Sequence, residues 1–172
     1  MECMEAIKGR RSIRKFKDRA VGKELIEELL HAAQMAPSAG NLHARDFVVV
    51  TDKATKQMLT KAALGQAFIE QAPVVIVFVA NTERSSRIYK SRGELYAVQD
   101  ATASVQNLLL AAHANGLATC WVGAFDESAV CEILGLPKKT RPIAIIPVGY
   151  ADEAPTAPRR MALDKVVHRE TW

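Results

Sequence analysis

The chain has 172 residues, of which 49% are hydrophobic and 24% charged, and its formal net charge is +4 at pH 7. This length suits a single domain spanning residues 1–172, and the lack of any run of 18 or more apolar residues argues against a membrane-spanning helix. The three scattered cysteines argue against a disulfide framework or a zinc site, so no metal is expected.

The first third of the chain predicts two helices followed by a strand. Met1–Lys8 has helical character, and apolar residues at helical spacing over 21–35 predict a second helix that Pro37 and Gly40 end. Asp46–Asp52 is rich in β-branched residues and predicts a strand closed by a polar turn.

The middle of the chain alternates short helical patterns with a strongly apolar stretch. Ala54–Ala63 and Gln66–Gln71 predict short helices. Ala72–Ala80 is continuously apolar, which is typical of a strand covered on both faces. Asn81–Gly93 is polar and charged, and therefore predicts a loop or a mobile excursion.

The last part of the chain begins with the longest helical pattern. Glu94–Gly116 is apolar most of the way round, which indicates a central buried helix or one packed against a partner. A strand and turn over 117–126, a helix over 127–136 and a buried strand over 141–152 follow. The whole pattern indicates a mixed chain with about four core strands and five or more helices.

Positive charge is concentrated in IKGRRSIRKFKD, residues 7–18, where the first helix should end. Ile13 and Phe16 are apolar and would anchor the segment to the core, so the arginines between them would be held rigidly. Guanidinium groups bind phosphate oxygens through paired hydrogen bonds, and Ser12 would add a hydroxyl donor. A solvated face and a phosphate socket both remain open, and nucleic acid is disfavoured because no aromatic residues interleave to stack bases.

Two other stretches suit a planar ligand. The turn PSAGN, residues 37–41, is rich in small residues, and its Ser and Asn side chains can bond the edge of a heterocycle; an ordinary turn after a helix has the same composition. GLATCWVGAFD, residues 116–126, predicts a strand whose end exposes backbone N–H groups, as would a core strand with a glycine bulge.

The usual catalytic motifs are missing. The sequence has no GxGxxG, GxxxxGK[ST], GxSxG or HExxH, and its four histidines are scattered without carboxylate or cysteine partners. We therefore nominate no catalytic side chain. The absence of these motifs indicates that a bound cofactor carries the chemistry.

The segments RRSIRKF, APSAGNLHARDF and GLATCWVGAF, in this order, resemble three blocks of the nitroreductase family of flavoproteins. The long helical pattern before the third block and the closing PRRMALDKVVHRETW resemble that family too, so the likeness runs from about Ile7 to Trp172. The chain departs from the family's frequent Gln-Pro-Trp at His43-Ala44-Arg45. The resemblance implies an α+β fold, with a central, mostly antiparallel sheet flanked by helices, in an intertwined homodimer.

The resemblance also implies that FMN binds between the two subunits, in contact with three groups of residues. The phosphate would be held by Arg10, Arg11, Ser12 and Arg14, closed by Arg159 or Arg160 from the tail. The other subunit would line the flavin with Pro37, Ser38, Ala39 and Asn41. The ring would lie against Trp121, Val122, Gly123 and Ala124, with the Gly123 amide toward N5 and Gln66 near the pyrimidine edge.

The activity that the resemblance implies is a two-step electron transfer. NADH or NADPH would reduce the flavin, and a small-molecule oxidant such as a nitroaromatic, a quinone or a flavin would reoxidise it. Two alternatives remain open: a family member that dehalogenates or consumes flavin, and a small basic nucleic-acid-binding domain. We expect a cytoplasmic protein without membrane or nucleic-acid partners, because acidic residues stand where a secretory signal would have basic ones.

Overall fold

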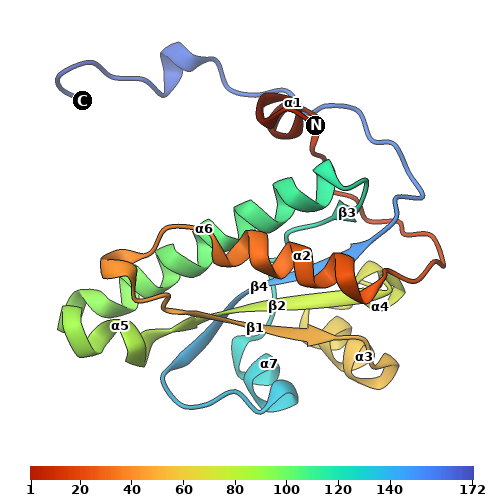
Figure 1. Cartoon of the computed structure of the whole chain (residues 1–172), viewed down its shortest axis with the longest axis horizontal. Coiled ribbons are helices and arrows are strands. Elements are labelled where there is room, and N and C mark those ends of the chain that lie inside the picture. The colour runs from red at the N-terminus through yellow and green to blue at the C-terminus, as the bar shows by residue number, and fades with distance from the viewer.

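The computed structural model describes residues 1–172 and is built on a four-stranded sheet with helices on both faces (Figure 1). The strands are β1 (Arg45–Val50), β2 (Val74–Asn81), β3 (Ala118–Thr119) and β4 (Thr140–Gly149). They lie in the order β1-β2-β4-β3, and every neighbouring pair is antiparallel. The expected central antiparallel sheet is confirmed.

Seven α-helices and three short 3₁₀ helices surround the sheet. The α-helices are α1 (Cys3–Gly9), α2 (Lys23–Gln34), α3 (Lys53–Ala62), α4 (Phe68–Gln71), α5 (Thr82–Tyr89), α6 (Gly93–Ala114) and α7 (Glu127–Leu134). The 3₁₀ helices are η1 (Ala39–Asn41), η2 (Lys90–Arg92) and η3 (Leu163–Lys165). None of these helices is both long enough and apolar enough to cross a membrane.

Alternating residues of the central strands build a core on each face of the sheet, because successive side chains of a strand point to opposite sides. Ile76 and Phe78 of β2 pack toward α2 and α6, together with Leu108. Val75 and Val77 of the same strand pack on the opposite face, toward α3, α4 and α7. Figure 1 shows these two helical layers above and below the sheet. The continuous apolar pattern of β2 thus reflects burial on both faces.

The prediction of a loop over Asn81–Gly93 is wrong, because this segment forms α5 and η2. The Asn81 side chain accepts a hydrogen bond from the Arg84 N–H at 3.0 Å and so caps the start of α5. Ser85 is fully buried, and α5 packs against the start of α6. A helix that buries a serine instead of aliphatic residues shows no apolar periodicity in the sequence.

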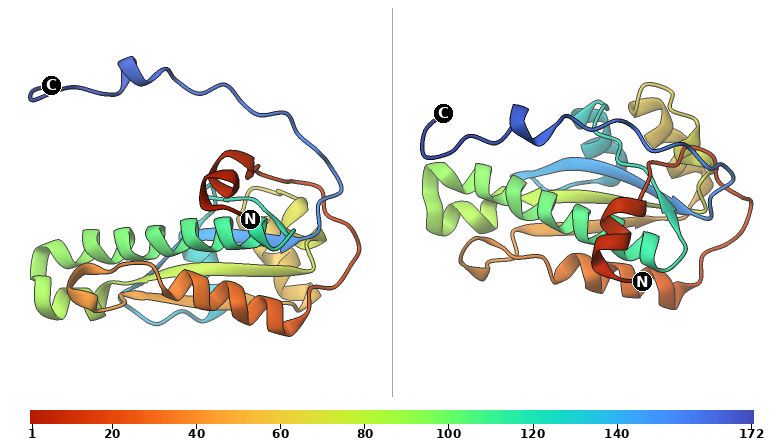
Figure 2. Two further views of the ribbon diagram at one scale, coloured as in Figure 1. Left: turned by 45° about the horizontal axis from the view of Figure 1, so that its top comes forward. Right: turned by 90° about the horizontal axis from the view of Figure 1, so that it is seen from above.

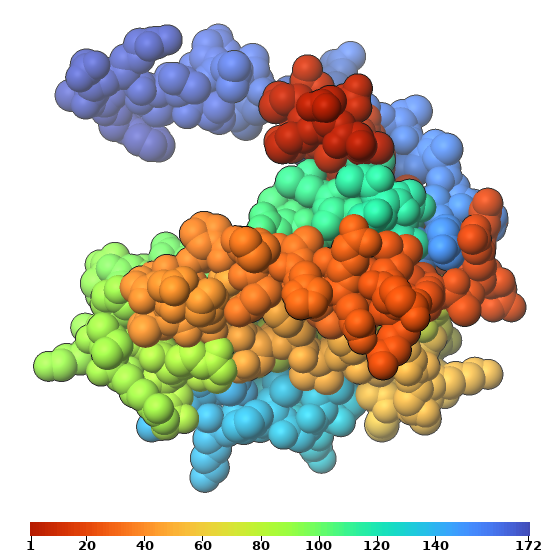
Figure 3. Space-filling view, viewed as in Figure 1, coloured from red at the N-terminus to blue at the C-terminus, as the bar shows by residue number.

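The strand expected over 117–126 is shorter than predicted. Only Ala118 and Thr119 pair with β4, and Val122 then makes an isolated antiparallel bridge with Ile145. Beyond the same end of β4 the chain continues as an arm, residues 153–172, all of which are exposed. Figures 1 and 3 show this arm passing beside α1 and then extending away from the rest of the molecule.

The contact between α5 and α6 leaves no room for a side chain at Gly93. This residue is buried, its φ is an ordinary helical −61°, and an added Cβ would clash with the backbone of Ser86. We expect Gly93→Ala to lower the free energy of unfolding by about 1–3 kcal/mol, although alanine normally favours helices. Urea denaturation measures this loss, and Gly22→Ala, whose Cβ would meet only the tip of Glu24, is the control. An unchanged or raised stability for Gly93→Ala would contradict this packing.

Candidate cofactor site

The basic segment after α1 is fixed to the sheet. The backbone N–H of Ile13 donates to Thr119 O at 2.9 Å, and Phe16 bridges Ala151 beyond the end of β4. The side chains of Ile13 and Phe16 are only 7% and 8% exposed. The predicted anchoring of this segment is confirmed, so the arginines beside these two residues start from a rigid backbone.

Residues from both ends of the chain meet in one polar hollow of about 380 Å³, here called the arginine socket. It is lined by Arg10, Arg11, Ser12, Arg14, Pro155, Thr156, Pro158 and Arg160. Arg160 therefore lies in the hollow, whereas Arg159, the alternative expected from the sequence, does not line it. Thr156 and the two prolines were not predicted from the sequence, because only the folded path of residues 153–160 brings them beside Arg10.

The positive charge of the arginine socket is not neutralised by the protein. None of the five ion pairs of the structure involves Arg10, Arg11 or Arg160. Burial, and then the neighbouring charges of Arg160 and Arg11, lower the pKa of the Arg10 guanidinium. One nitrogen of Arg11 donates to the Lys8, Gly9 and Arg10 carbonyls at the end of α1. An anion would relieve this repulsion, so the socket fits a phosphate group.

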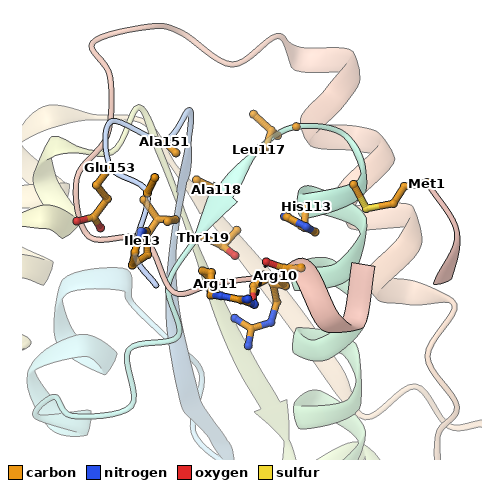
Figure 4. Close-up of a pocket in the computed structure, with 14 residues that line it drawn as sticks. Met1, Arg10, Arg11, Ile13, His113, Leu117, Ala118, Thr119, Ala151 and Glu153 are labelled. Atoms are coloured by element: carbon orange, nitrogen blue, oxygen red, sulfur yellow. Dashed lines mark hydrogen bonds between the residues drawn. The ribbon is translucent and has the colours of Figure 1, made fainter. Parts of the chain in front are cut away.

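A second cavity of about 510 Å³ adjoins the socket and shares Arg10 and Arg11 with it (Figure 4). His113 of α6 lies on its wall, as does the apolar side chain of Leu117. Burial, followed by the charges of Arg10 and Arg11, lowers the pKa of His113. This histidine therefore adds little positive charge near neutral pH, and the arginines remain the main cations here.

The segment after β3 presents free backbone donors. The isolated bridge fixes Val122 to Ile145 through hydrogen bonds of 3.1 and 3.0 Å, and Val122 is 2% exposed. The next two residues, Gly123 and Ala124, are exposed, and their N–H groups donate to no protein acceptor. Such unpaired amides on a fixed backbone suit a polar ring edge.

Gln66 lies beside this segment, because its side-chain amide donates to Ala124 O at 3.2 Å and to Ala63 O at 2.9 Å. Trp121 is 36% exposed next to it. Within one chain the structure therefore brings together Gln66 and the 121–124 segment, and links both to the arginine socket through Thr119. These backbone contacts connect the first and third motif blocks of the sequence within one chain.

The turn Pro37–Asn41 lies away from the arginine socket. The Ala39 N–H donates to the Asp100 carboxylate near the start of α6 at 2.9 Å, whereas Arg10 and Arg11 adjoin His113 near its end. An α-helix rises about 1.5 Å per residue, so Asp100 and His113 lie about 20 Å apart along it. Both views of Figure 2 show this turn and α1 at different ends of α6. Within one chain, the second motif block (APSAGNLHARDF) therefore does not meet the first and third blocks.

Two residues near this turn were not singled out from the sequence. Arg45 is 2% exposed and Asp100 is 5% exposed, and both bond the backbone around the turn. Asp100 did carry a signal, because it is the one acid in the interior of an otherwise apolar helical pattern. Arg45 stood out only as part of the departure at His43-Ala44-Arg45, and its burial was not expected because arginines are mostly exposed.

Comparison with known proteins gives consistent results. The chain is 34% identical to an NADH dehydrogenase of Thermus thermophilus, over 97% of this chain and 95% of that protein. It is 28% identical to an FMN reductase [NAD(P)H] of Bacillus subtilis, over 99% of this chain and 74% of that protein. The solved NADPH:FMN oxidoreductase of Vibrio harveyi in complex with NAD⁺ superimposes with a TM-score of 0.92 at 29% identity, covering 99% of this chain and 77% of that one.

The sequence profile of the nitroreductase family matches residues 7–71 and 59–150 of the chain. These two segments contain all three motif blocks and the long helix α6. The sequence profile and the fold agree, and the family expected from the motifs is confirmed. The chain belongs to the nitroreductase family.

Proposed function

We propose that this chain is an FMN-dependent oxidoreductase that passes electrons from NADH or NADPH to a small oxidant such as a nitroaromatic, a quinone or a flavin. The arginine socket carries this proposal, because its cations converge from both ends of the chain and have no acidic partner. The names of the similar proteins, which include an NADH dehydrogenase and an FMN reductase, support the same donor and cofactor.

The residues present would hold FMN in two regions. Arg10, Arg160 and the Ser12 hydroxyl would bind the phosphate, with Arg14 at the rim. The flavin ring would lie along 121–124, where the free N–H groups of Gly123 and Ala124 would face its polar atoms. Gln66 would reach the edge of the ring from beside Ala124. The positive charges meet in one hollow instead of spreading along a face, which favours a small phosphorylated ligand over nucleic acid.

FMN would supply the redox chemistry: it accepts a hydride from a nicotinamide and passes the electrons on to an oxidant. The chain's own part is to bind and orient. The socket fixes the phosphate end, and backbone donors beside the ring favour an electron-rich flavin through their dipoles. We nominate no side chain of this site as an acid or base.

A second copy of the chain would complete the site. The turn Pro37–Asn41 lies at the opposite end of α6 from the arginine socket, so it would serve the flavin of the partner. Beyond the socket residue Arg160, the arm exposes five large apolar side chains: Met161, Leu163, Val166, Val167 and Trp172. An arm of this kind would be buried against the second subunit of a homodimer.

The role of the phosphate socket is tested by comparing FMN with riboflavin, which lacks the phosphate. We expect Arg10→Met to weaken FMN binding by roughly 10- to 100-fold, the range for losing a charge-assisted hydrogen bond. Riboflavin should bind the wild type and this variant about equally in a fluorescence titration. Arg141→Met is the control, because Arg141 is paired with Glu127 outside the socket. Equal losses for FMN and riboflavin would show that Arg10 does not act on the phosphate.

The activity itself is tested by separating its two halves in a stopped-flow spectrophotometer. Without oxygen, NADH or NADPH should bleach the flavin absorbance of the FMN-loaded protein, and a quinone or nitroaromatic should restore it. The faster nucleotide identifies the preferred donor. A wild-type protein that takes up no FMN, or whose bound FMN neither nucleotide reduces, contradicts the proposed function.

A further inference from the structure

We propose that Arg45 and Asp100 are positioning residues of the flavin site, and that together they form a clamp on the turn Pro37–Asn41. Each subunit's clamp would hold this turn in the shape that the partner's flavin requires. The inference rests on the proposed function, but the contacts that carry it lie within one chain.

Arg45 binds the backbone on one side of the turn. Its buried guanidinium donates to the carbonyls of Ala36 at 2.6 Å, Gln34 at 2.7 Å and Pro37 at 3.0 Å. These carbonyls lie at the C-terminal end of α2 and just beyond it, where no helical N–H is left to bond them and a positive charge is favourable. Arg45 thus ends α2 and fixes the direction in which the chain leaves it.

Asp100 binds the other side of the same turn. One carboxylate oxygen accepts a hydrogen bond from the Ala39 N–H at 2.9 Å, and the other accepts one from the Ala44 N–H at 3.3 Å. Burial lowers the pKa of Arg45, and the nearby Asp100 charge acts in the opposite direction. The carbonyl groups before the turn and the amide groups within and after it are therefore held by two buried, oppositely charged side chains.

The turn needs this support because its backbone is strained. Gly40 and Asn41 both have a φ of +56°, and His43 has a φ of +49°. The left-handed region is unfavourable for residues other than glycine, and such residues keep it only when their surroundings impose it. Asn41 is exposed and its side chain has no partner within the chain, so the imposed shape leaves it free for a ligand.

The first test compares Arg45→Met with a matched control. Lys56→Met is that control, because Lys56 is also buried, at 8% exposure, and donates to the Ala72 carbonyl after α4, away from the turn. Both variants should lose stability. Only Arg45→Met should speed amide hydrogen exchange over 38–44 and weaken FMN binding by about tenfold or more. If Arg45→Met does not fold, Asp100→Asn replaces it, since it keeps the side chain's shape and removes the charge.

The outcomes separate this inference from the proposed function. If the wild type binds FMN, and Arg45→Met matches Lys56→Met in both affinity and exchange, the clamp is overturned and the function stands. If the wild type binds no FMN, the proposed function fails first. Exchange over 38–44 in the flavin-free protein still reports on the clamp in that case, and equal exchange in the two variants overturns it.

The second test asks whether the clamp acts on the partner's site. Co-expression of Arg45→Met with Arg10→Met, under two affinity tags, yields mixed dimers in which one site has an intact socket facing an intact turn. The other site of the same dimer then carries both defects. We expect the mixed dimer to bind one FMN with wild-type affinity, although neither parent dimer does. If the turn served the socket of its own chain, both sites would be defective, and the absence of any tight site would overturn the inference.

Discussion

The candidate site depends on a concentration of positive charge that the protein does not neutralise. Arg10, Arg11 and Arg160 converge on one hollow although they come from opposite ends of the chain, and no acid pairs with them. Their repulsion is tolerated because Ile13 and Phe16 are buried and pin the basic segment to the sheet. The mutual repulsion of these arginines destabilises the folded chain, and a bound anion would offset that repulsion. A phosphorylated cofactor therefore fits the socket.

The helix α6 sets the distance between the two groups of candidate site residues. One end lies beside the arginine socket through His113, and the other end holds the Pro37–Asn41 turn through Asp100. A rigid helix of this length keeps the two halves of the proposed flavin site apart within one chain. Two copies of the chain would bring each half to its complement, and the exposed apolar arm would bury its surface at the same time.

The sequence predicted most strands and helices, because burial on a strand or a helix face leaves a regular apolar pattern. The antiparallel sheet and the roles of the three motif blocks were expected only from the resemblance to the family. The prediction failed where the buried residues are polar, charged or glycine. α5 buries Ser85 and rests against Gly93, so Asn81–Gly93 looked like a solvated loop. Arg45 belongs to His43-Ala44-Arg45, where the chain departs from the family's frequent Gln-Pro-Trp, and nothing in the sequence showed that it would be buried. Its role depends on carbonyls that only the folded turn brings together.

A crystal structure of the FMN-loaded protein is the most direct test of this arrangement. We expect a homodimer in which the phosphate of each flavin lies within hydrogen-bond distance of Arg10 and Arg160 of one subunit. The ring of the same flavin should contact the Pro37–Asn41 turn of the other subunit. A flavin phosphate bound away from these arginines, or a flavin enclosed entirely by one chain, would contradict it.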